Sequence, residues 1–279
     1  MFKRFTALVV LLSFSLIIAA CGNGGNKEKE EKTAWDQIKK DGKLVVATSG
    51  TLYPTSYHDE KSKELTGYEV ELVRELAKRL KLKVEFSEMA FDGMLTSVNS
   101  GKVDLAANDI SITDERKEKF EFTKPYKYSY GTAMVRKDDL SGIKTLDDLK
   151  GKKAGGEATT VFMDIARKHG AKEVIYDNAS SDQYMKDLAA GRTDVILNDY
   201  YLQRLAAAYY KDLNVTIHPD IKYYPNNQAI ILKKGSTELA EKINAALDEM
   251  KEDGTLSKLS KQYYEGADVS QKPDVEFQD

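Results

Sequence analysis

Residues 100–109, SGKVDLAAND, decide the fold, because their pattern returns at residues 190–199 as AGRTDVILND. Each copy contains a glycine suited to ending a helix, a basic residue, an aspartate two positions later, an apolar strand and a final Asn-Asp pair. The repeat predicts two similar α/β halves. Ligands of open α/β sheets gather at the carboxyl ends of strands, so two such ends facing each other would form a cleft. The alternative is a chance similarity between two ordinary helix–strand junctions.

On both sides of each copy, short β-rich runs alternate with segments of helical periodicity. Residues 68–80, for example, place Val70, Val73, Ala77 and Leu80 on one stripe. Strands separated by such helices pair in parallel through crossovers, which predicts an α/β fold. The expected strands are 44–47, 84–86, 103–107, 152–156, 173–176 and 195–198. The expected helices are 68–80, 92–99, 160–169, 182–190, 200–210, one through 239–250 and a short one ending at 264, and the tail after Gly266 is expected to fray.

The composition is that of a soluble globular protein: of 279 residues, 41% are hydrophobic and 31% are charged, with a formal net charge of -3. This length is consistent with two lobes or two small domains. No segment carries a dominant run of Lys and Arg, so nucleic acid is not an expected partner. The three histidines, His58, His169 and His218, lack metal-ligand spacing, and no nucleotide-binding or nucleophile motif occurs. We expect neither a metal nor a cofactor.

The amino terminus has the form of a secretory signal peptide. Lys3 and Arg4 precede an uninterrupted run of apolar and small residues that is too short for a comfortable membrane span. The run ends at Cys21, the only cysteine, in a context that resembles the lipobox of bacterial lipoproteins, where the cysteine is diacylated, for example with palmitate. We expect residues 1–20 to be the signal peptide and 21–42 to be the lipidated cysteine with a flexible tether. An uncleaved anchor with an inert cysteine is the alternative.

Several ordered motifs make the chain resemble the bacterial ABC-transporter solute-binding proteins of family 3, the polar amino-acid branch. The resemblance runs from Lys43 to Tyr264, nearly the whole body of the expected mature protein. Two motifs, FDGML at 91–95 and NDISIT at 108–113, are most similar to cystine-type members. The other matching segments are LTGYEVEL at 65–72, DERK at 114–117, FTKPY at 122–126, and residues 146–153, 190–199 and 250–256.

The resemblance implies a two-lobed, type II periplasmic-binding-protein-like fold whose hinge consists of two crossing strands. The first lobe would comprise residues 43–131 and 226–279 and the second lobe residues 132–225, with the crossing strands near 131–135 and 228–232. The resemblance also implies the partners, which are a small amino-acid ligand and the permease subunits of an ABC importer. We expect a monomer, held by its lipid at the outer face of the cytoplasmic membrane, as in Gram-positive bacteria.

A free amino acid presents one carboxylate and one ammonium on the same carbon, and this chemistry directs the choice of site residues. Arg116 follows Thr113, an expected helix N-cap, and its guanidinium can hold a carboxylate through two parallel hydrogen bonds. By resemblance, Arg116 binds the ligand's α-carboxylate and Asp199 binds its α-ammonium. The residues that complete this shell are Ser111, Asn108 and Asp109. The alternatives are a solvated Arg116 in a charged run and an Asp199 that only caps the following helix.

The expected second lobe contributes a strand-to-helix turn at Thr159 and Thr160, whose backbone N–H groups and hydroxyls form an anion site. The family usually has a glycine where this chain has Ala158, and an ordinary helix cap is the alternative. Arg116 lies on the first lobe and Asp199 on the second. Neither lobe alone would satisfy the ligand, so binding would favour closure of the two lobes.

Aromatic side chains are expected to pack against the ligand. Phe91 lies where relatives present an aromatic platform, and either Tyr53 or Leu52 supplies a second wall. The alternative for Tyr53 is a purely structural role without contact with the ligand. Glu157, together with Asp109, would favour a cationic ligand or one with two amines.

These observations predict the extracellular binding component of an amino-acid importer. The alternative from another class is an exported enzyme on the same fold, similar to dehydratase-like relatives of the binding proteins, with Asp109 or Glu157 as an acid in the cleft. Steady-state turnover of a substrate would support the enzyme, and stoichiometric binding without product would support transport. A sensor domain is a third hypothesis, but no membrane span or signalling module follows the body of the chain.

Overall fold

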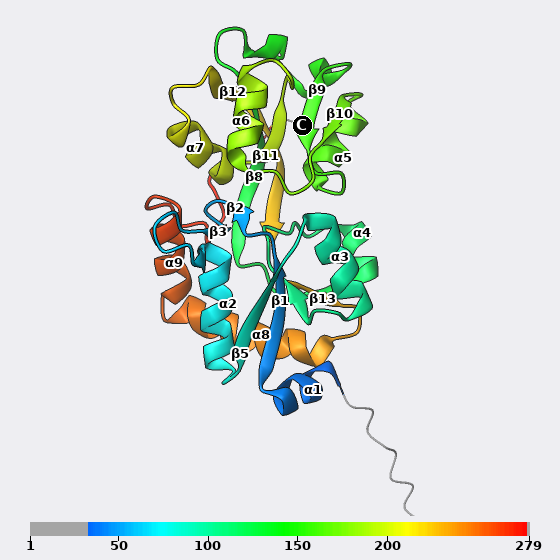
Figure 1. Cartoon of the computed structure of the whole chain (residues 1–279), viewed down its shortest axis with the longest axis vertical. Coiled ribbons are helices and arrows are strands. Elements are labelled where there is room, and N and C mark those ends of the chain that lie inside the picture. Colours follow the sequence, from blue (N-terminus) through cyan, green and yellow to red (C-terminus); the bar gives the residue numbers. More distant parts are fainter. Residues whose placement is uncertain (1–32, 278–279) are drawn as a thin grey trace, which may run out of the picture. The chain divides into compact units, whose positions relative to one another are not determined.

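The computed structural model describes residues 33–277 (Figure 1). The signal peptide predicted over residues 1–20 and the lipidation predicted at Cys21 lie outside the described residues. Within 33–277, no helix is long and apolar enough to cross a lipid bilayer. The described elements gather around two groups of sheets, which we call the first lobe and the second lobe.

A five-stranded sheet organises the first lobe, in the order β5-β1-β6-β13-β7. In that order the strands are Lys83–Glu88, Lys43–Thr48, Leu105–Ala106, Ile231–Lys233 and Phe120–Phe122. Strand β1 pairs in parallel with β5 and β6, whereas β13 is antiparallel to β6 and β7. A smaller sheet beside it consists of β2 (Thr51–Leu52), β3 (Ser56–His58) and β4 (Leu65–Thr66). Because β13 follows the second lobe in sequence, the C-terminal region completes the first lobe.

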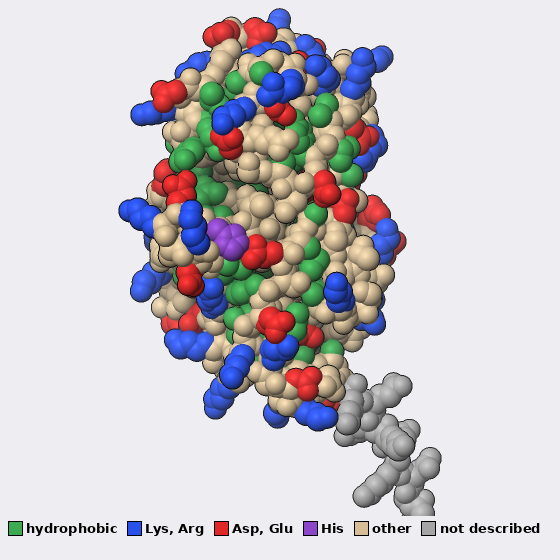
Figure 2. Space-filling view, in the orientation of Figure 1, with side chains coloured by type: hydrophobic (Ala, Val, Ile, Leu, Met, Phe, Trp, Pro, Cys, Tyr) green, Lys and Arg blue, Asp and Glu red, His purple; other side chains and the backbone are tan. Residues whose placement is uncertain are grey.

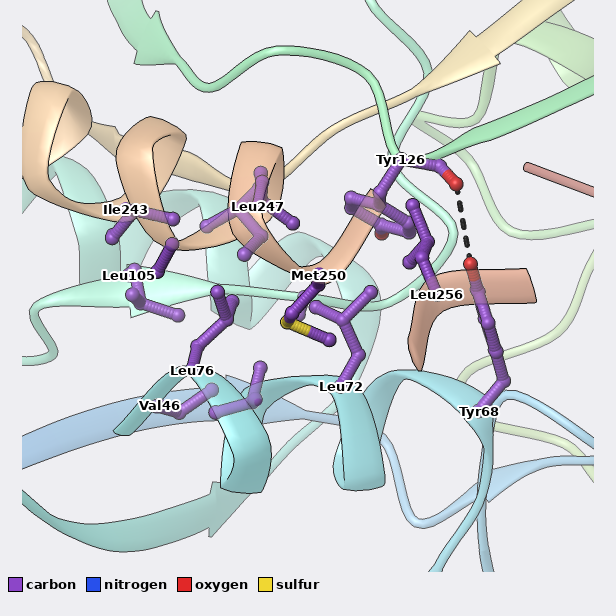
Figure 3. Close-up of a cluster of buried hydrophobic side chains, with 14 of the residues drawn as sticks. Val46, Tyr68, Leu72, Leu76, Leu105, Tyr126, Ile243, Leu247, Met250 and Leu256 are labelled. Atoms are coloured by element: carbon purple, nitrogen blue, oxygen red, sulfur yellow. Dashed lines mark hydrogen bonds between the residues drawn. The ribbon is translucent and has the colours of Figure 1, made fainter. Parts of the chain in front are cut away.

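Helices pack on both faces of the five-stranded sheet, because successive residues of β1 point to opposite sides. Val46 belongs to a core with α2 and α8, while Ala47 belongs to a core with α3. Figure 3 shows Leu72 and Leu76 of α2 against Met250 of α8. The helices of this lobe are α1 (Ala34–Asp41), α2 (Tyr68–Arg79), α3 (Phe91–Ser100), α4 (Asp114–Lys119), α8 (Thr237–Glu252) and α9 (Thr255–Tyr263).

The second lobe is built on two long antiparallel strands, β8 (Lys127–Arg136) and β12 (Val215–Gln228). These two strands are also the segments by which the chain passes between the lobes. Strand β11 (Ile196–Asp199) pairs with the other edge of β8, and an Ala154–Val195 bridge joins β9 (Lys153–Gly156) and its parallel neighbour β10 (Lys172–Ile175) to this group. The helices are α5 (Val161–Lys168), α6 (Ser181–Ala189) and α7 (Tyr200–Tyr209), with 3-10 turns at Leu140–Gly142 and Leu146–Leu149.

The two copies of the sequence repeat have the same structural role in the two lobes. Gly101 and Gly191 follow α3 and α6 with positive φ angles of 73° and 72°, a backbone region that glycine adopts at low cost. The Asp104 carboxylate accepts the N–H of Val45 at 2.7 Å, and the Asp194 carboxylate accepts the N–H of Lys153 at 2.9 Å. Each aspartate therefore anchors its copy to the neighbouring strand. In the first copy this leaves β6 shorter than the expected 103–107.

Two expected flexible segments are ordered in the structure. The tether predicted over 21–42 is wrong for its last part, because α1 forms there: Thr33 and Asp36 make a capping box and Ile38 packs into the core. The frayed tail predicted after Gly266 is also wrong for its first residues. Val269 is fully buried, and its carbonyl accepts the N–H of Tyr128 at 2.8 Å.

The core between α2 and α8 can be tested by truncating Leu76, which is 1% exposed. We expect Leu76→Ala to lower the free energy of unfolding by about 2–5 kcal/mol in urea titrations, because it removes buried methyl groups and leaves a cavity. Ile175→Ala is the control, since Ile175 is 51% exposed on β10 and its truncation should cost less than about 1 kcal/mol. Equal losses in the two variants would contradict this description of the core.

Candidate functional site

A cavity of about 130 Å³ lies between the two lobes. Its walls come from the carboxyl ends of strands, where ligands of α/β sheets bind. From the first lobe it is lined by Ser49 after β1 and Asn108 after β6, and from the second lobe by Glu157 after β9 and Asn198 at the end of β11. The repeat therefore brings the ends of its two copies to one cavity, as the sequence predicted.

Arg116 is a buried cation at the wall of this cavity, and not a solvated member of its charged run. Its side chain lies on α4 behind the Thr113 N-cap, and the residue is 8% exposed. One terminal nitrogen donates to the Ser111 carbonyl and the other to the Thr159 carbonyl, both at 2.9 Å. The guanidinium carbon lies 5.4 Å from the centre of the Phe91 ring. Burial lowers the pKa of Arg116, because a low-dielectric environment disfavours the charged form.

The Arg116 guanidinium has no counterion among residues 33–277. No carboxylate of that part of the chain lies within 4.0 Å of it. A guanidinium carries five N–H donors, and the two carbonyls use two of them, so one hydrogen on each terminal nitrogen and the Nε hydrogen are left. A buried cation in this condition is stabilised by an anion, and a carboxylate can accept two parallel hydrogen bonds.

Asp109 supplies negative charge at the same cavity. Its backbone lies in the left-handed region, with φ 55°, and its N–H donates to both oxygens of the buried Glu69 carboxylate at 2.8–2.9 Å. The Asp109 side chain pairs with Lys127 at 2.5 Å, and Asp109 is among the residues that line the cavity. Burial, and then the neighbouring Asp199, raise the pKa of Asp109 to about 6, while Lys127 acts in the opposite direction.

Asp199 does not line the cavity, contrary to the expected direct contact with a ligand. It is fully buried, and its Oδ1 accepts the N–H groups of Tyr201 and Leu202 as the N-cap of α7. Its Oδ2 accepts a hydrogen bond from Gln228 at 3.2 Å and lies 3.3 Å from the Lys127 ammonium. Three hydrogen bonds and one ion pair thus surround the carboxylate. Lys127, and not a ligand, is the cation beside Asp199 in this structure.

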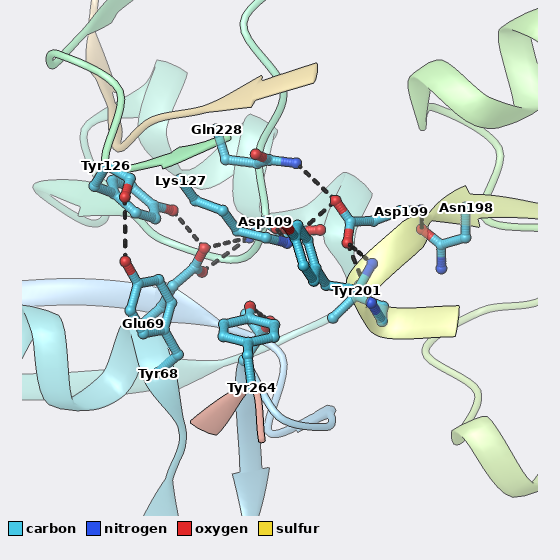
Figure 4. A network of polar contacts seen from close by, with 12 residues as sticks. Tyr68, Glu69, Asp109, Tyr126, Lys127, Asn198, Asp199, Tyr201, Gln228 and Tyr264 are labelled. Carbon is cyan, nitrogen blue, oxygen red and sulfur yellow. Dashed lines mark hydrogen bonds and ion pairs between the residues drawn. The ribbon is translucent and has the colours of Figure 1, made fainter. Parts of the chain in front are cut away.

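Lys127 and Glu69 are the two buried charged residues of the site that the sequence analysis missed (Figure 4). Lys127 is fully buried at the start of β8; burial lowers its pKa, but Asp109 and Asp199 together raise it well above the usual value. Glu69 accepts hydrogen bonds from Asp109 and from the Tyr126 hydroxyl. One signal was present: Glu69 stands on the buried stripe of α2 at helical spacing from Leu72 and Leu76.

The remaining expected polar residues divide between the cavity wall and its supports. Ser111 and Asn108 line the cavity and are nearly fully buried, and the Asn108 side chain accepts the N–H of Ser49 at 3.0 Å. Thr160 also lines the cavity, but its hydroxyl accepts the N–H of Met163 as the N-cap of α5. Thr159 is not among the lining residues. It supports Arg116 through its carbonyl and bonds Asp92 through its hydroxyl.

The residues expected to form aromatic walls lie at the cavity. Phe91 is 6% exposed and lines the cavity beneath Arg116. Leu52 and Tyr53, between which the sequence left the choice open, both line it. Tyr53 is the more open, at 44% exposed, with its ring against that of Tyr57 at 4.8 Å between centroids.

No metal site appears among residues 33–277, and no basic surface appears on the face that Figure 2 displays. Within 33–277 no three side chains of His, Cys, Asp or Glu are grouped so that they could hold a metal ion. Figure 2 shows Lys and Arg side chains interspersed with Asp and Glu over the face that it displays, with no field of one sign. That face lacks the basic stripe that binds nucleic acid.

Comparison with known proteins agrees with this geometry. The model of the bacterial extracellular solute-binding proteins, family 3, matches residues 44–266. The chain belongs to this family.

Two relatives from Bacillus subtilis (strain 168) cover almost all of the chain. The probable ABC transporter extracellular-binding protein YckB is 67% identical over 270 residues, which are 96% of this chain and 94% of YckB. The L-cystine-binding protein TcyA is 36% identical over 275 residues, which are 96% of this chain and 99% of TcyA.

Solved structures of family members have the same fold. A crystal structure of YckB, 70% identical, covers 88% of this chain and 98% of its own, with a TM-score of 0.71. An ancestral arginine-binding protein bound to arginine, 33% identical, covers 80% and 98% with a TM-score of 0.72. The predictions of the family, of its α/β periplasmic-binding-protein-like fold and of a binding protein rather than an enzyme are confirmed.

The buried acidic group of this family member predicts a dependence of its stability on pH. Burial and the nearby Asp109 raise the pKa of Glu69 to about 8. The folded state therefore binds a proton more tightly than the unfolded state. This stabilisation is complete below the ordinary glutamate pKa and is lost as pH rises through about 8. We expect urea titrations at pH 5.5 and 7.5 to show lower stability at the higher pH, and Glu69→Gln to reduce this difference by about 1 kcal/mol or more.

Glu241→Gln is the control for that measurement, because Glu241 is exposed on α8 and its loss should leave the pH dependence unchanged. If Glu69→Gln and the parent protein lose the same stability between the two pH values, the proton is not held at Glu69.

Proposed function

We propose that this chain is the ligand-binding component of an amino-acid ABC importer and that it holds the ligand's carboxylate at Arg116 and its ammonium at Asp109. The observation that carries the proposal is a buried cation without a counterion at a cavity that an acidic residue also lines. Arg116 has no carboxylate partner within residues 33–277. Asp109 and Asp199 share the single ammonium of Lys127.

The charges around the cavity balance when a zwitterion enters. At pH 7 the pKa of Asp109, raised to about 6, leaves this carboxylate largely ionised, while Glu69, with a pKa of about 8, holds a proton. The two aspartates and Lys127 then carry one net negative charge, and Arg116 carries one positive charge. An α-amino acid has one charge of each sign, so it neutralises both groups without burying a further net charge.

Asp109 is the better partner for the ammonium because it is among the residues that line the cavity, whereas Asp199 is not and already accepts three hydrogen bonds. In this proposal Asp199 does not contact the ligand. It contributes its negative charge and shares the Lys127 ammonium with Asp109. The ligand's carboxylate meets the three N–H donors of Arg116 that the Ser111 and Thr159 carbonyls leave over.

The family relatives support a polar amino acid as the ligand, with cystine or a cationic amino acid as the candidates. TcyA, by name an L-cystine-binding protein, is 36% identical. The arginine-binding extracellular protein ArtP of Bacillus subtilis is 30% identical over 95% of this chain. Both ligands carry the carboxylate and ammonium that the charged groups of this cavity match.

Binding would couple to closure of the lobes over the cavity, with residues 43–131 and 226–279 as one rigid part and 132–225 as the other. The support is the set of direct contacts that cross the cavity. Arg116 donates to the Thr159 carbonyl at 2.9 Å, and the Thr51 hydroxyl donates to the Asn178 side chain at 2.8 Å. A ligand that engages both sides stabilises this closed form, whose shape a permease can distinguish from an open one.

The chain would work at the outer face of the cytoplasmic membrane, held by acyl groups on Cys21 after removal of residues 1–20. The support is the apolar run before a lone cysteine in the sequence and the name of the relative YckB, which is an extracellular-binding protein. Cys21 itself lies outside the described residues.

The proposed clamp is tested by a thermal-shift screen of the mature domain against all the amino acids and cystine. We expect at least one of them to raise the unfolding temperature of the parent protein. Arg116→Ala should abolish this shift, and Asp109→Asn should weaken binding by about 10-fold or more, because each leaves one charge of the ligand unpaired.

Arg192→Ala is the matched control, since Arg192 is 63% exposed in its side chain and lies outside the cavity; it should respond like the parent. If the Arg116→Ala protein folds and the ligand still raises its unfolding temperature as in the parent, the proposed clamp is wrong.

The proposed anchor is tested by expressing the full chain with Cys21→Ser in a Gram-positive host. The variant should lose incorporation of labelled palmitate and should appear in the culture medium instead of the membrane fraction, because it lacks the acylated thiol. Retention of the label by the variant would place the lipid elsewhere.

A further inference from the structure

Glu157 is a second carboxylate of the cavity, and the amino-acid clamp does not use it. It follows β9, is half-buried and lines the cavity from the second lobe. No ion pair holds it within residues 33–277, and the backbone N–H of Asn178 is the neighbouring group that favours its charged form. Asn178 is fixed in turn by the Thr51 hydroxyl of the opposite lobe, at 2.8 Å. Contact between the lobes therefore positions this carboxylate.

The charged and titratable groups that face Glu157 offer it no positive charge. Asp92 on α3 and Asp177 in the loop after β10 are acidic, and Tyr184 on α6 is a neutral phenol. Burial, followed by repulsion from Asp92 and Asp177, raises the pKa of Glu157 to about 6. A cation placed beside Glu157 would remove this penalty.

The cavity wall on this side suits an apolar stem that ends in a positively charged nitrogen. Phe162, Tyr184 and Met185 line it, and aromatic faces attract cations. Gln203 also lines it, and its Oε1 is buried without a hydrogen-bond partner among the described residues. An unused acceptor of this kind is satisfied by an N–H donor.

We propose that Glu157 is a specificity-determining residue that selects amino acids with a second positively charged nitrogen. The inference rests on the proposed function, because the first ammonium and the carboxylate of the ligand are assigned to Asp109 and Arg116. Two sources supply the second nitrogen: the side chain of a cationic amino acid, or the second ammonium of cystine. An uncharged side chain gains nothing from Glu157.

The test measures the affinities of the mature protein for L-arginine, L-lysine and L-cystine against neutral L-glutamine and L-leucine by calorimetry at pH 7.5. The parent should bind at least one of the first three more tightly than both neutral amino acids. Glu157→Gln should lower the affinity for that ligand by about 10-fold to 100-fold and should change the affinities for the neutral amino acids by less than about twofold. Tight binding of arginine or lysine would identify a cationic side chain, and tight binding of cystine alone would identify a second ammonium.

Two further variants separate charge from folding. Glu157→Asp keeps the charge and should retain part of the preference, while Glu241→Gln makes the same chemical change at an exposed position of α8 and should match the parent. Unfolding of each protein without ligand establishes that it is folded. If Glu157→Gln does not fold, Glu157→Asp provides the test. Affinity ratios equal to the parent's for every ligand in Glu157→Asp would overturn the specificity role of Glu157.

The dependence on pH adds an independent readout. A cation binds ionised Glu157. Because the pKa of Glu157 is about 6, its partial protonation on going from pH 7.5 to 5.5 weakens the attraction. Asp109 titrates in the same range but serves every ligand equally. The ratio of affinities for the preferred and neutral amino acids should therefore fall at pH 5.5 in the parent and stay constant in Glu157→Gln.

The outcomes distinguish the two proposals. If the parent binds none of the amino acids, the proposed function and this inference fail together. If the parent binds amino acids but Glu157→Gln leaves the ratio of affinities unchanged, only the role of Glu157 is overturned.

Discussion

The ammonium of Lys127, held between Asp109 and Asp199, is the interaction on which the architecture of the site depends. It is fully buried, 2.5 Å from one carboxylate and 3.3 Å from the other. Removing a charge from water costs several kcal/mol unless close partners compensate for it, so neither the lysine nor the aspartates would be stable here alone. Because Asp109 belongs to the first lobe and Asp199 to the second, the lysine also fixes how the two lobes meet beside the cavity.

This interaction gives the sequence repeat a physical meaning. Each copy ends a strand with Asn-Asp, and the two aspartates converge on one cation at the start of β8, a strand that passes between the lobes. Two similar halves would place two like charges near each other, which is unfavourable. The single positive charge of Lys127 balances only one of the two negative charges, so the group keeps one net negative charge beside the cavity. An approximate symmetry of the fold thus produces an asymmetric, charged site.

The sequence was sufficient for the fold because its signals are local and repeated. Glycines after helices, alternating apolar strands and the two anchoring aspartates recur at the same spacing in both halves, and Gly101 and Gly191 adopt the backbone that their positions required. Arg116 was also predictable, since a helix cap at Thr113 sets its place at the start of α4. The order of α1 was not, because the burial of Ile38 depends on a core made by distant residues.

Asp199 shows why the rest of the site could not be predicted from the sequence. Its position at a strand end was correct, but its partner, Lys127, comes from a different strand and is brought there by the pairing of β8 with β11. Which carboxylate remains accessible is decided by such tertiary contacts, and charge alone is not enough to reveal it. The burial of Lys127 beneath the cavity wall leaves Asp109 as the accessible carboxylate, on the same lobe as Arg116. In the proposed clamp, one lobe then carries both charged contacts with the ligand's α-carbon groups, and the second lobe contacts the ligand's side chain.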